Sequence, residues 1–206
     1  MKIVLKVQNL EVLNIQKNRR LPRRYSIDGM SFDVEQEERI IIVGGRGAGK
    51  DTLKDALLNK KKGVSVHSDY EIIEPPKDNN FSRNQIIIKN GFFTRDQFHK
   101  NSDERVDPDA PKHWTLLRKA KEAGCTFIAI AEIDKLESDK SGEFSRIIII
   151  DMGRIVADTK EQEFKKTLSY WITHYARERY ISLRQDCQIL KTKFDLKLEN
   201  SDWLNK

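Results

Sequence analysis

Apolar residues gather along this chain in short, nearly continuous runs, each about the length of a strand. Residues 3–7 and 30–34 predict two short strands that form an antiparallel sheet. The runs at residues 40–43 and 85–88 are typical of strands buried on both faces of a parallel sheet. Two more apolar runs lie at residues 126–131 and 146–151. A weaker strand candidate lies at residues 63–66.

Stretches with helical spacing separate these runs. We expect helices at residues 51–59 and 114–123, with Gly124 ending the second. Residues 152–154 predict a turn, so that residues 155–157 form a hairpin with the apolar run at residues 146–151. Turn-rich loops are expected at residues 16–24, 74–80 and 94–112. Strands that alternate with helices predict an α/β domain with a parallel core, which we place at residues 1–160.

Residues 161–206 have a different pattern. Apolar residues recur there at intervals of three and four up to about Lys193, with Lys and Arg between them, which predicts one or two amphipathic helices. Such a C-terminal helical extension could pack on the domain's own sheet, dock on a partner, support dimerisation or lie on a membrane surface. We favour packing for its first half and docking for the remainder.

Composition narrows the class of protein. The chain has 206 residues, a formal net charge of +6, and 38% hydrophobic and 34% charged residues, as expected for one folded, highly solvated domain with an appendage. The positive charge favours an acidic partner, but a solvated basic surface explains it more simply, and nucleic acid is not an expected partner. Cys125 and Cys187 are too few and too far apart for a disulfide framework or a zinc knuckle, which indicates a reducing compartment.

Hydropathy bears on location as well. The apolar opening of the chain turns polar too soon for a signal peptide. No later apolar run approaches the roughly 18 residues of a membrane-spanning helix. We therefore expect a cytoplasmic chain that does not itself cross a membrane.

The clearest chemical motif directly follows the apolar run at residues 40–43. It reads Gly44-Gly45-Arg46-Gly47-Ala48-Gly49-Lys50 and leads into the helix expected at residues 51–59. Glycines at this spacing let backbone N–H groups turn toward phosphate oxygens, the helix adds its positive end, and the lysine reaches the terminal phosphates. The motif therefore predicts a phosphate-binding loop, or P-loop, for a nucleotide.

One position departs from the usual P-loop. A Ser or Thr that ligates Mg²⁺ normally follows the lysine, whereas this chain has Asp51 there and Thr52 one residue later. We expect both residues to belong to the nucleotide site and Asp51 to be a metal ligand. The carboxylate adds negative charge beside the phosphates, so it could weaken nucleotide binding or displace the metal.

Taken together, these motifs resemble the nucleotide-binding (ATPase) subunit of an ABC transporter, over roughly residues 2–73 and 112–164. The resemblance is carried by residues 27–34, by Gly47-Ala48-Gly49-Lys50, and by residues 124–131 and 146–158. It implies a P-loop NTPase core with an N-terminal antiparallel sheet, ATP and Mg²⁺ as ligands, and Tyr25 stacking on the adenine. It also implies a transmembrane permease as partner, a homo- or heterodimer, and a place on the inner face of the membrane.

The resemblance further implies a glutamine that senses Mg²⁺, a signature motif, an Asp-Glu pair ending an apolar strand, and a switch histidine. The stretch from residue 63 to residue 111 is too short for these elements together with the usual helical subdomain, so that subdomain is expected to be reduced. Gln85 could be the sensing glutamine and a metal residue. Residues 81–85 could instead be a decayed signature.

The Asp-Glu pair has two candidate positions. Asp103 and Glu104 have the right chemistry, as metal ligand and catalytic base, but they follow a polar stretch. If residues 86–88 are the strand in question, Lys89 and Asn90 stand where the carboxylates belong. A core parallel strand must be apolar, which favours the second alignment.

Under that alignment the glutamate that would polarise the attacking water is missing. The catalytic switch position falls on Glu132, which cannot donate a hydrogen bond to a phosphate as histidine can. The sequence therefore favours an ABC-type subunit with impaired catalysis that acts as an adaptor or regulatory partner. Two alternatives stay open: an active ABC ATPase that uses Asp103-Glu104, and a nucleoside monophosphate kinase, which the string Gly49-Lys50-Asp51-Thr52 resembles.

Overall fold

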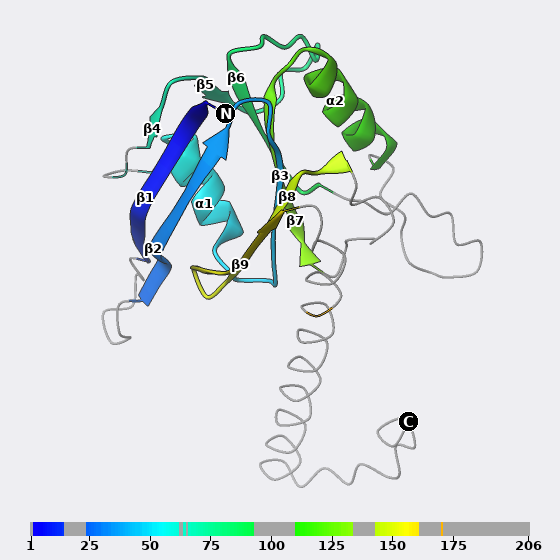
Figure 1. Ribbon diagram of the computed structural model, residues 1–206. Coiled ribbons are helices and arrows are strands. Elements are labelled where there is room, and N and C mark those ends of the chain that lie inside the picture. The colour runs from blue at the N-terminus through cyan, green and yellow to red at the C-terminus, as the bar shows by residue number, and fades with distance from the viewer. Residues whose placement is uncertain are drawn as a thin grey trace, which may run out of the picture. The chain divides into compact units, whose positions relative to one another are not determined.

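Figure 1 shows the computed structural model of the chain, which describes residues 2–14, 24–61, 64, 66–92, 110–133, 143–160 and 170. The chain divides into two compact units, Met1–Leu168 and Ser169–Lys206. In the second unit only Tyr170 is described, and it is helical and exposed. The amphipathic helices expected after residue 160, and the loop expected before Arg24, lie almost wholly outside the described residues.

Two sheets make up the described part of the first unit. The smaller pairs β1 (Ile3–Asn14) with β2 (Arg24–Glu35) in antiparallel register and adds β4 (His67–Ser68) to the other side of β1. The expected N-terminal antiparallel sheet is thereby confirmed, with longer strands than the apolar runs suggested. Val64 and Val66, from the weak candidate at residues 63–66, are not in a strand, and β4 begins directly after them.

The larger sheet has the order β5-β6-β7-β3-β8-β9 in the described part of the chain. Its strands are β3 (Arg39–Gly44), β5 (Glu71–Ile73), β6 (Gln85–Asn90), β7 (Thr126–Glu132), β8 (Arg146–Asp151) and β9 (Arg154–Lys160). Neighbours from β5 to β8 run parallel, while β9 returns antiparallel to β8 as the expected hairpin. The carboxyl ends of the parallel strands therefore meet at one edge of the sheet.

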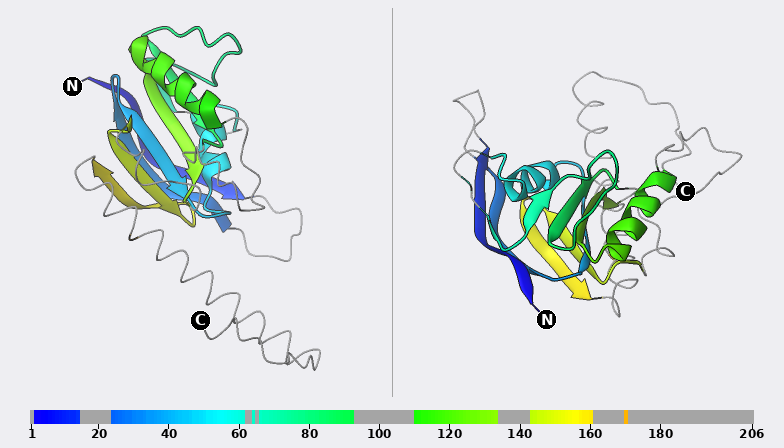
Figure 2. Two further views of the ribbon diagram at one scale, coloured as in Figure 1. Left: turned by 90° about the vertical axis from the view of Figure 1, so that its right-hand side faces the viewer. Right: turned by 90° about the horizontal axis from the view of Figure 1, so that it is seen from above.

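Helices cover the two faces of this sheet (Figures 1 and 2). Helix α1 (Lys50–Leu57) lies between the large sheet and the β1–β2 layer, and Leu53, Ala56 and Leu57 are fully buried there. Helix α2 (Ala110–Glu122) lies on the opposite face, where its residues contact β7. Because side chains alternate along a strand, Ile40 and Ile42 join the core on the α1 side, and the strands must be apolar on both faces.

The start of α2 differs from the expectation. The sequence suggested a loop closed by Pro111 and a helix from residue 114, whereas the helix begins at Ala110. Proline is compatible with the first helical turn, where an N–H has no intrahelical partner, so Pro111 sits inside the helix start rather than before it. The α/β class with a P-loop core is otherwise confirmed.

Candidate functional site

The P-loop connects the end of β3 to the start of α1, as its sequence predicts. Gly47 and Gly49 have φ of 81° and 100°, in the left-handed region that glycine adopts without strain. Gly49 is the N-cap of α1, and no side chain caps this helix end. Backbone N–H groups and the positive end of the helix dipole are thus placed where an anion can be bound.

The β8–β9 hairpin and strand β2 lie against the loop and explain why Gly44 and Gly49 have no side chain. A Cβ on Gly44 would lie 2.4 Å from the carbonyl oxygen of Ile150 in β8, and one on Gly49 would lie 2.4 Å from that of Ser26 in β2. The backbone of Gly153, in the β8–β9 turn, donates to the Ala48 carbonyl at 3.0 Å. The β8–β9 hairpin and β2 of the antiparallel sheet therefore pack directly against the loop.

Lys50 extends across the loop. Its Nζ donates to the carbonyl oxygens of Gly44 and Gly45 at 2.9 and 2.7 Å. The ammonium group therefore lies beside the turn of the backbone, within reach of a phosphate held by the loop. Arg46 and Gly47, at the tip, are exposed, which leaves the loop open to a ligand.

Asp51 contacts the neighbouring strand β6. The side-chain amide of Asn90 donates from Nδ2 to Asp51 Oδ1 at 2.8 Å, and Asn90 Oδ1 accepts from the backbone N–H of Gly91 at 2.9 Å. Thr52, one residue further along α1, is half-buried. Asn90 was identified in the sequence only as a residue standing where a carboxylate belongs, and its contact with Asp51 depends on the crossing of α1 over β6.

Lys89, the neighbour of Asn90, faces the other side of the sheet. Side chains alternate along a strand, so Asn90 lies on the α1 side and Lys89 on the α2 side. There Lys89 lines a pocket of about 510 Å³ together with Lys77, Lys112 and His113. Only Asn90 of this pair belongs to the P-loop site.

Glu132 ends β7 next to the P-loop. It is the register partner of Gly44 and is half-buried, so it lies at the same edge of the sheet as the P-loop, and its catalytic role stays a prediction. Tyr25 lies in β2, and its side chain is outside the described residues, as are Asp103 and Glu104. The described residues contain no group of three or more His, Cys, Asp or Glu side chains that could hold a metal by themselves.

Gln85 is far from the P-loop, which corrects its assignment as a metal residue. It begins β6, whereas Asn90 ends it, and five residues of strand span roughly 16 Å. Its amide instead donates to Glu71 Oε2 at 3.0 Å, and its Oε1 accepts from the backbone of Ser82 at 2.9 Å. Counting residues from Lys50 could not reveal which end of the strand Gln85 occupies.

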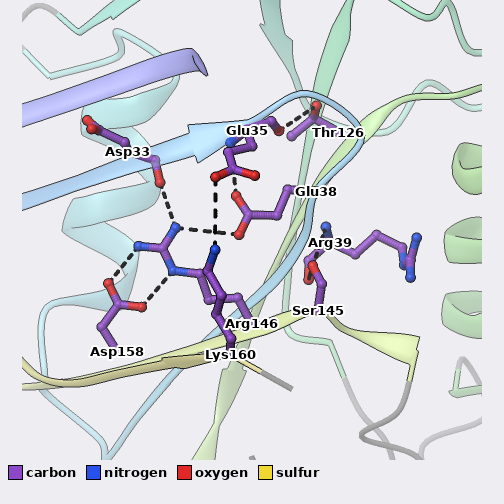
Figure 3. A network of polar contacts seen from close by, with 9 residues as sticks. All are labelled: Asp33, Glu35, Glu38, Arg39, Thr126, Ser145, Arg146, Asp158 and Lys160. Carbon is purple, nitrogen blue, oxygen red and sulfur yellow. Dashed lines mark hydrogen bonds and ion pairs between the residues drawn. The ribbon is translucent and has the colours of Figure 1, made fainter. Parts of the chain in front are cut away.

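The opposite edge of the sheet has a polar network of its own (Figure 3). Arg146 at the start of β8 donates to both carboxylate oxygens of Asp158 at 2.6 Å, to the Asp33 carbonyl at 2.8 Å and to Glu38 at 3.5 Å. The hydrogen bond to Asp158 raises the pKa of Arg146, against the effect of burial. This network ties β2, β8 and β9 together and lies away from the P-loop.

No protein-family model matches this chain, and no curated protein matches its sequence. Solved structures of ATP-binding cassettes do share its fold. MJ1267, an ATP-binding cassette of an ABC transporter, is 13% identical with a TM-score of 0.57, over 82% of this chain and 96% of that one.

Two further structures agree. The cassette MJ0796, solved as a dimer bound to ADP and Pi, is 12% identical with a TM-score of 0.53, over 76% of this chain and 98% of that one. CbiO1 from Clostridium perfringens, part of the ABC transporter complex CbiONQ, is 14% identical with a TM-score of 0.52, over 93% and 100%. The chain therefore has the P-loop NTPase fold of the ABC transporter ATPases.

Proposed function

We propose that this chain is an ABC-type nucleotide-binding subunit that binds ATP at its P-loop, hydrolyses it slowly or not at all, and acts as an adaptor or regulatory partner of a membrane permease. The observation that carries the proposal is the combination of an intact phosphate loop with a β6 that ends without a carboxylate. The phosphate loop supports nucleotide binding, and the missing carboxylate supports slow hydrolysis.

The loop supports binding through its backbone and its lysine. Gly47 and Gly49 have the positive φ that turns N–H groups inward, and Lys50 lies over the loop carbonyls. Phosphate oxygens would take over the contacts that Lys50 makes with the Gly44 and Gly45 carbonyls. A charge-assisted hydrogen bond to phosphate is stronger than one to a neutral carbonyl, so the exchange favours the ligand.

The end of β6 supports slow hydrolysis. Its last residues and the two that follow are Lys89, Asn90, Gly91 and Phe92, none of which carries a carboxylate. A residue that orients the attacking water is a recurring part of NTP-hydrolysing P-loop sites. Glu132 ends the next strand and can only accept hydrogen bonds when ionised, so it cannot replace a donor to the γ-phosphate.

The partner belongs to the proposal as well. CbiO1 is described as part of a transporter complex and MJ0796 as a dimer, and this chain shares their fold. In the described part of the chain, no helix has both the length and the apolar character to cross a membrane. We therefore propose a permease as the membrane component, with this chain bound to it on the inner face.

Titration calorimetry of the full chain with ATP tests the binding half of the proposal. The wild-type protein should bind ATP with 1:1 stoichiometry, and Lys50→Ala should weaken binding at least about tenfold, since it removes a charged phosphate contact. Lys54→Ala is the matched control, because Lys54 lies on the same helix but pairs with Asp55 and Glu74. Equal affinity for wild type and Lys50→Ala would contradict a P-loop site.

Co-purification tests the partner. The tagged full chain, purified from detergent extracts of its native cells, should bring a multi-span permease with it, identified by mass spectrometry. Recovery of the chain alone, under conditions in which the permease is folded, would contradict the adaptor role.

The kinase alternative is less well supported, because it accounts for neither the antiparallel sheet nor the β8–β9 hairpin, and both are present.

A further inference from the structure

The geometry points to an exchange of chemistry between two positions of the metal site: Asp51 on α1 supplies the carboxylate that binds the nucleotide's Mg²⁺, and Asn90 at the end of β6 holds that carboxylate in place. This inference rests on the proposed function and adds to it a defined metal ligand. It assigns Asn90 as a positioning residue rather than a ligand.

Hydrogen bonding fixes the orientation of the Asn90 amide. The backbone N–H of Gly91 can only donate, so the Asn90 atom that it contacts at 2.9 Å must be the carbonyl oxygen. The NH₂ group then faces Asp51 and donates to Oδ1 at 2.8 Å. The amide therefore presents a donor to Asp51 and leaves the second carboxylate oxygen for another partner.

The two residues carry the same total charge as a usual P-loop metal site, but the carboxylate and the neutral donor have exchanged places. In that arrangement a neutral hydroxyl follows the P-loop lysine and an aspartate stands on the strand, so the hydroxyl can donate to the carboxylate. Here the helix carries the carboxylate and the strand carries the neutral donor. One negative charge is present in either case, so Asp51 adds none in total beside the phosphates.

Asp51 suits Mg²⁺ in its place and exposure. It directly follows Lys50 and is exposed, so a metal at its carboxylate would also be close to phosphates held by the loop. Mg²⁺ is usually bound by one or two carboxylates together with substrate phosphates and water. A site with a single protein carboxylate therefore fits the absence of a larger ligand cluster among the described residues.

A purely structural explanation accounts for only half of this pair. An aspartate in the first turn of a helix is favourable because of the helix dipole, and this would explain Asp51 alone. It does not explain an amide at the end of a buried strand whose NH₂ faces that aspartate. An aspartate at position 90 would place two carboxylates in contact, which is unfavourable without a cation between them.

The experiment measures how strongly Mg²⁺ tightens ATP binding. Titration calorimetry gives the Kd for ATP in excess MgCl₂ and in EDTA, and the ratio of the two is the magnesium effect. Wild type should show an effect of about tenfold or more. Asp51→Ala should bring the ratio close to one while ATP still binds in EDTA, and Asn90→Ala should lower it by loosening Asp51.

A double variant that restores the usual pair of residues gives the most specific test. Asp51→Ser combined with Asn90→Asp rebuilds the usual hydroxyl and carboxylate, and it should regain the magnesium effect that Asp51→Ala loses. Asp55→Asn is the matched control, since Asp55 is a carboxylate of the same helix that pairs with Lys54, and its ratio should equal that of wild type. Regain in the double variant also shows that the substitutions do not unfold the protein.

The outcomes separate the two claims. If wild type binds ATP and Asp51→Ala keeps the full magnesium effect, or if the double variant is no better than Asp51→Ala, the exchange is overturned while the nucleotide-binding function stands. If wild type shows no magnesium effect although ATP binds, the exchange is likewise overturned. If wild type does not bind ATP in either buffer, the proposed function fails, and this inference fails with it.

Discussion

Two glycines of the P-loop are needed for different reasons. Gly44 has no room for a side chain, because a Cβ would lie 2.4 Å from the Ile150 carbonyl and 2.9 Å from the Cβ of Ala48. Gly47 has open space around it, and only its φ of 81° favours glycine. The first is a packing constraint and the second a conformational one.

Gly44→Ala should therefore destabilise the protein more than Gly47→Ala. We expect a loss of about 2 kcal/mol in the free energy of unfolding for Gly44→Ala, because backbone must move to admit the methyl group. For Gly47→Ala we expect about 1 kcal/mol, the cost of a left-handed conformation for alanine. Urea unfolding without nucleotide measures both, and equal losses would contradict the packing argument.

Cys125 offers a second test at the residue scale. It is buried, its Sγ contacts the Ser82 carbonyl at 3.0 Å, and burial raises its pKa. Since the thiolate is the reactive form, less of it is present at a given pH than for an exposed thiol. In a Cys187→Ser background, disulfide-exchange reagents at pH 8 should label Cys125 only as fast as the protein opens. Rapid labelling of folded protein would contradict its burial.

Sequence reasoning at this scale located features whose residues are neighbours along the chain. The P-loop is such a case, because strand, glycines, lysine and helix are contiguous. Gln85 is the opposite case, since its distance from the loop depends on the direction of β6. The contact between Asp51 and Asn90 joins two residues 39 positions apart, and no local pattern reveals it.

Among the elements, the apolar runs predicted the buried strands well, because a strand buried on both faces is a continuous run of apolar residues. Element ends were predicted less well. β1 and β2 continue beyond their apolar cores through alternating polar residues, and α2 begins before its first apolar turn. These ends are set by pairing with a neighbouring strand or by packing, which a run of hydrophobic residues does not record.

The Arg146 network should stabilise the junction of β2, β8 and β9. Arg146 is 14% exposed, and its partner Glu38 is 9% exposed. Arg146→Met should therefore lower the free energy of unfolding by about 2 kcal/mol or more, because it leaves the carboxylates of Glu38 and Asp158 without their cation.

Arg154→Met is the matched control for this prediction. Arg154 lies on the same hairpin and pairs with Asp28, but its side chain is 69% exposed. Exposed ion pairs contribute little, so we expect a loss below about 1 kcal/mol. Chemical denaturation of both variants, compared with wild type, measures the difference. Similar losses would contradict the view that burial gives the Arg146 network its importance.

At the scale of the whole molecule, the topology brings the site together. The parallel order β6-β7-β3-β8 places Asn90, Glu132, the P-loop and the end of β8 along one edge, and the hairpin and the antiparallel sheet pack against the loop. The sequence predicted the class of fold and most strands, but strand order arises from long-range pairing and became known only from the structure.

Ligand binding to this assembled site should raise the stability of the whole domain. A ligand at 100 times its Kd stabilises the folded state by about 2.7 kcal/mol, provided that it does not bind the unfolded chain. Thermal unfolding with saturating ATP should therefore show a clear increase in Tm for wild type. Lys50→Ala, which binds ATP at least about tenfold more weakly, should show a clearly smaller increase at the same ATP concentration, and an equal increase in both proteins would indicate that ATP binds elsewhere.

Steady-state hydrolysis by the purified full chain with Mg²⁺ distinguishes a subunit that binds ATP without rapid turnover from an active ATPase. We expect a rate well below about 1 per second at ATP concentrations that saturate binding. A rate above about 1 per second that Lys50→Ala abolishes would contradict it, and would favour an active ATPase that uses Asp103 and Glu104.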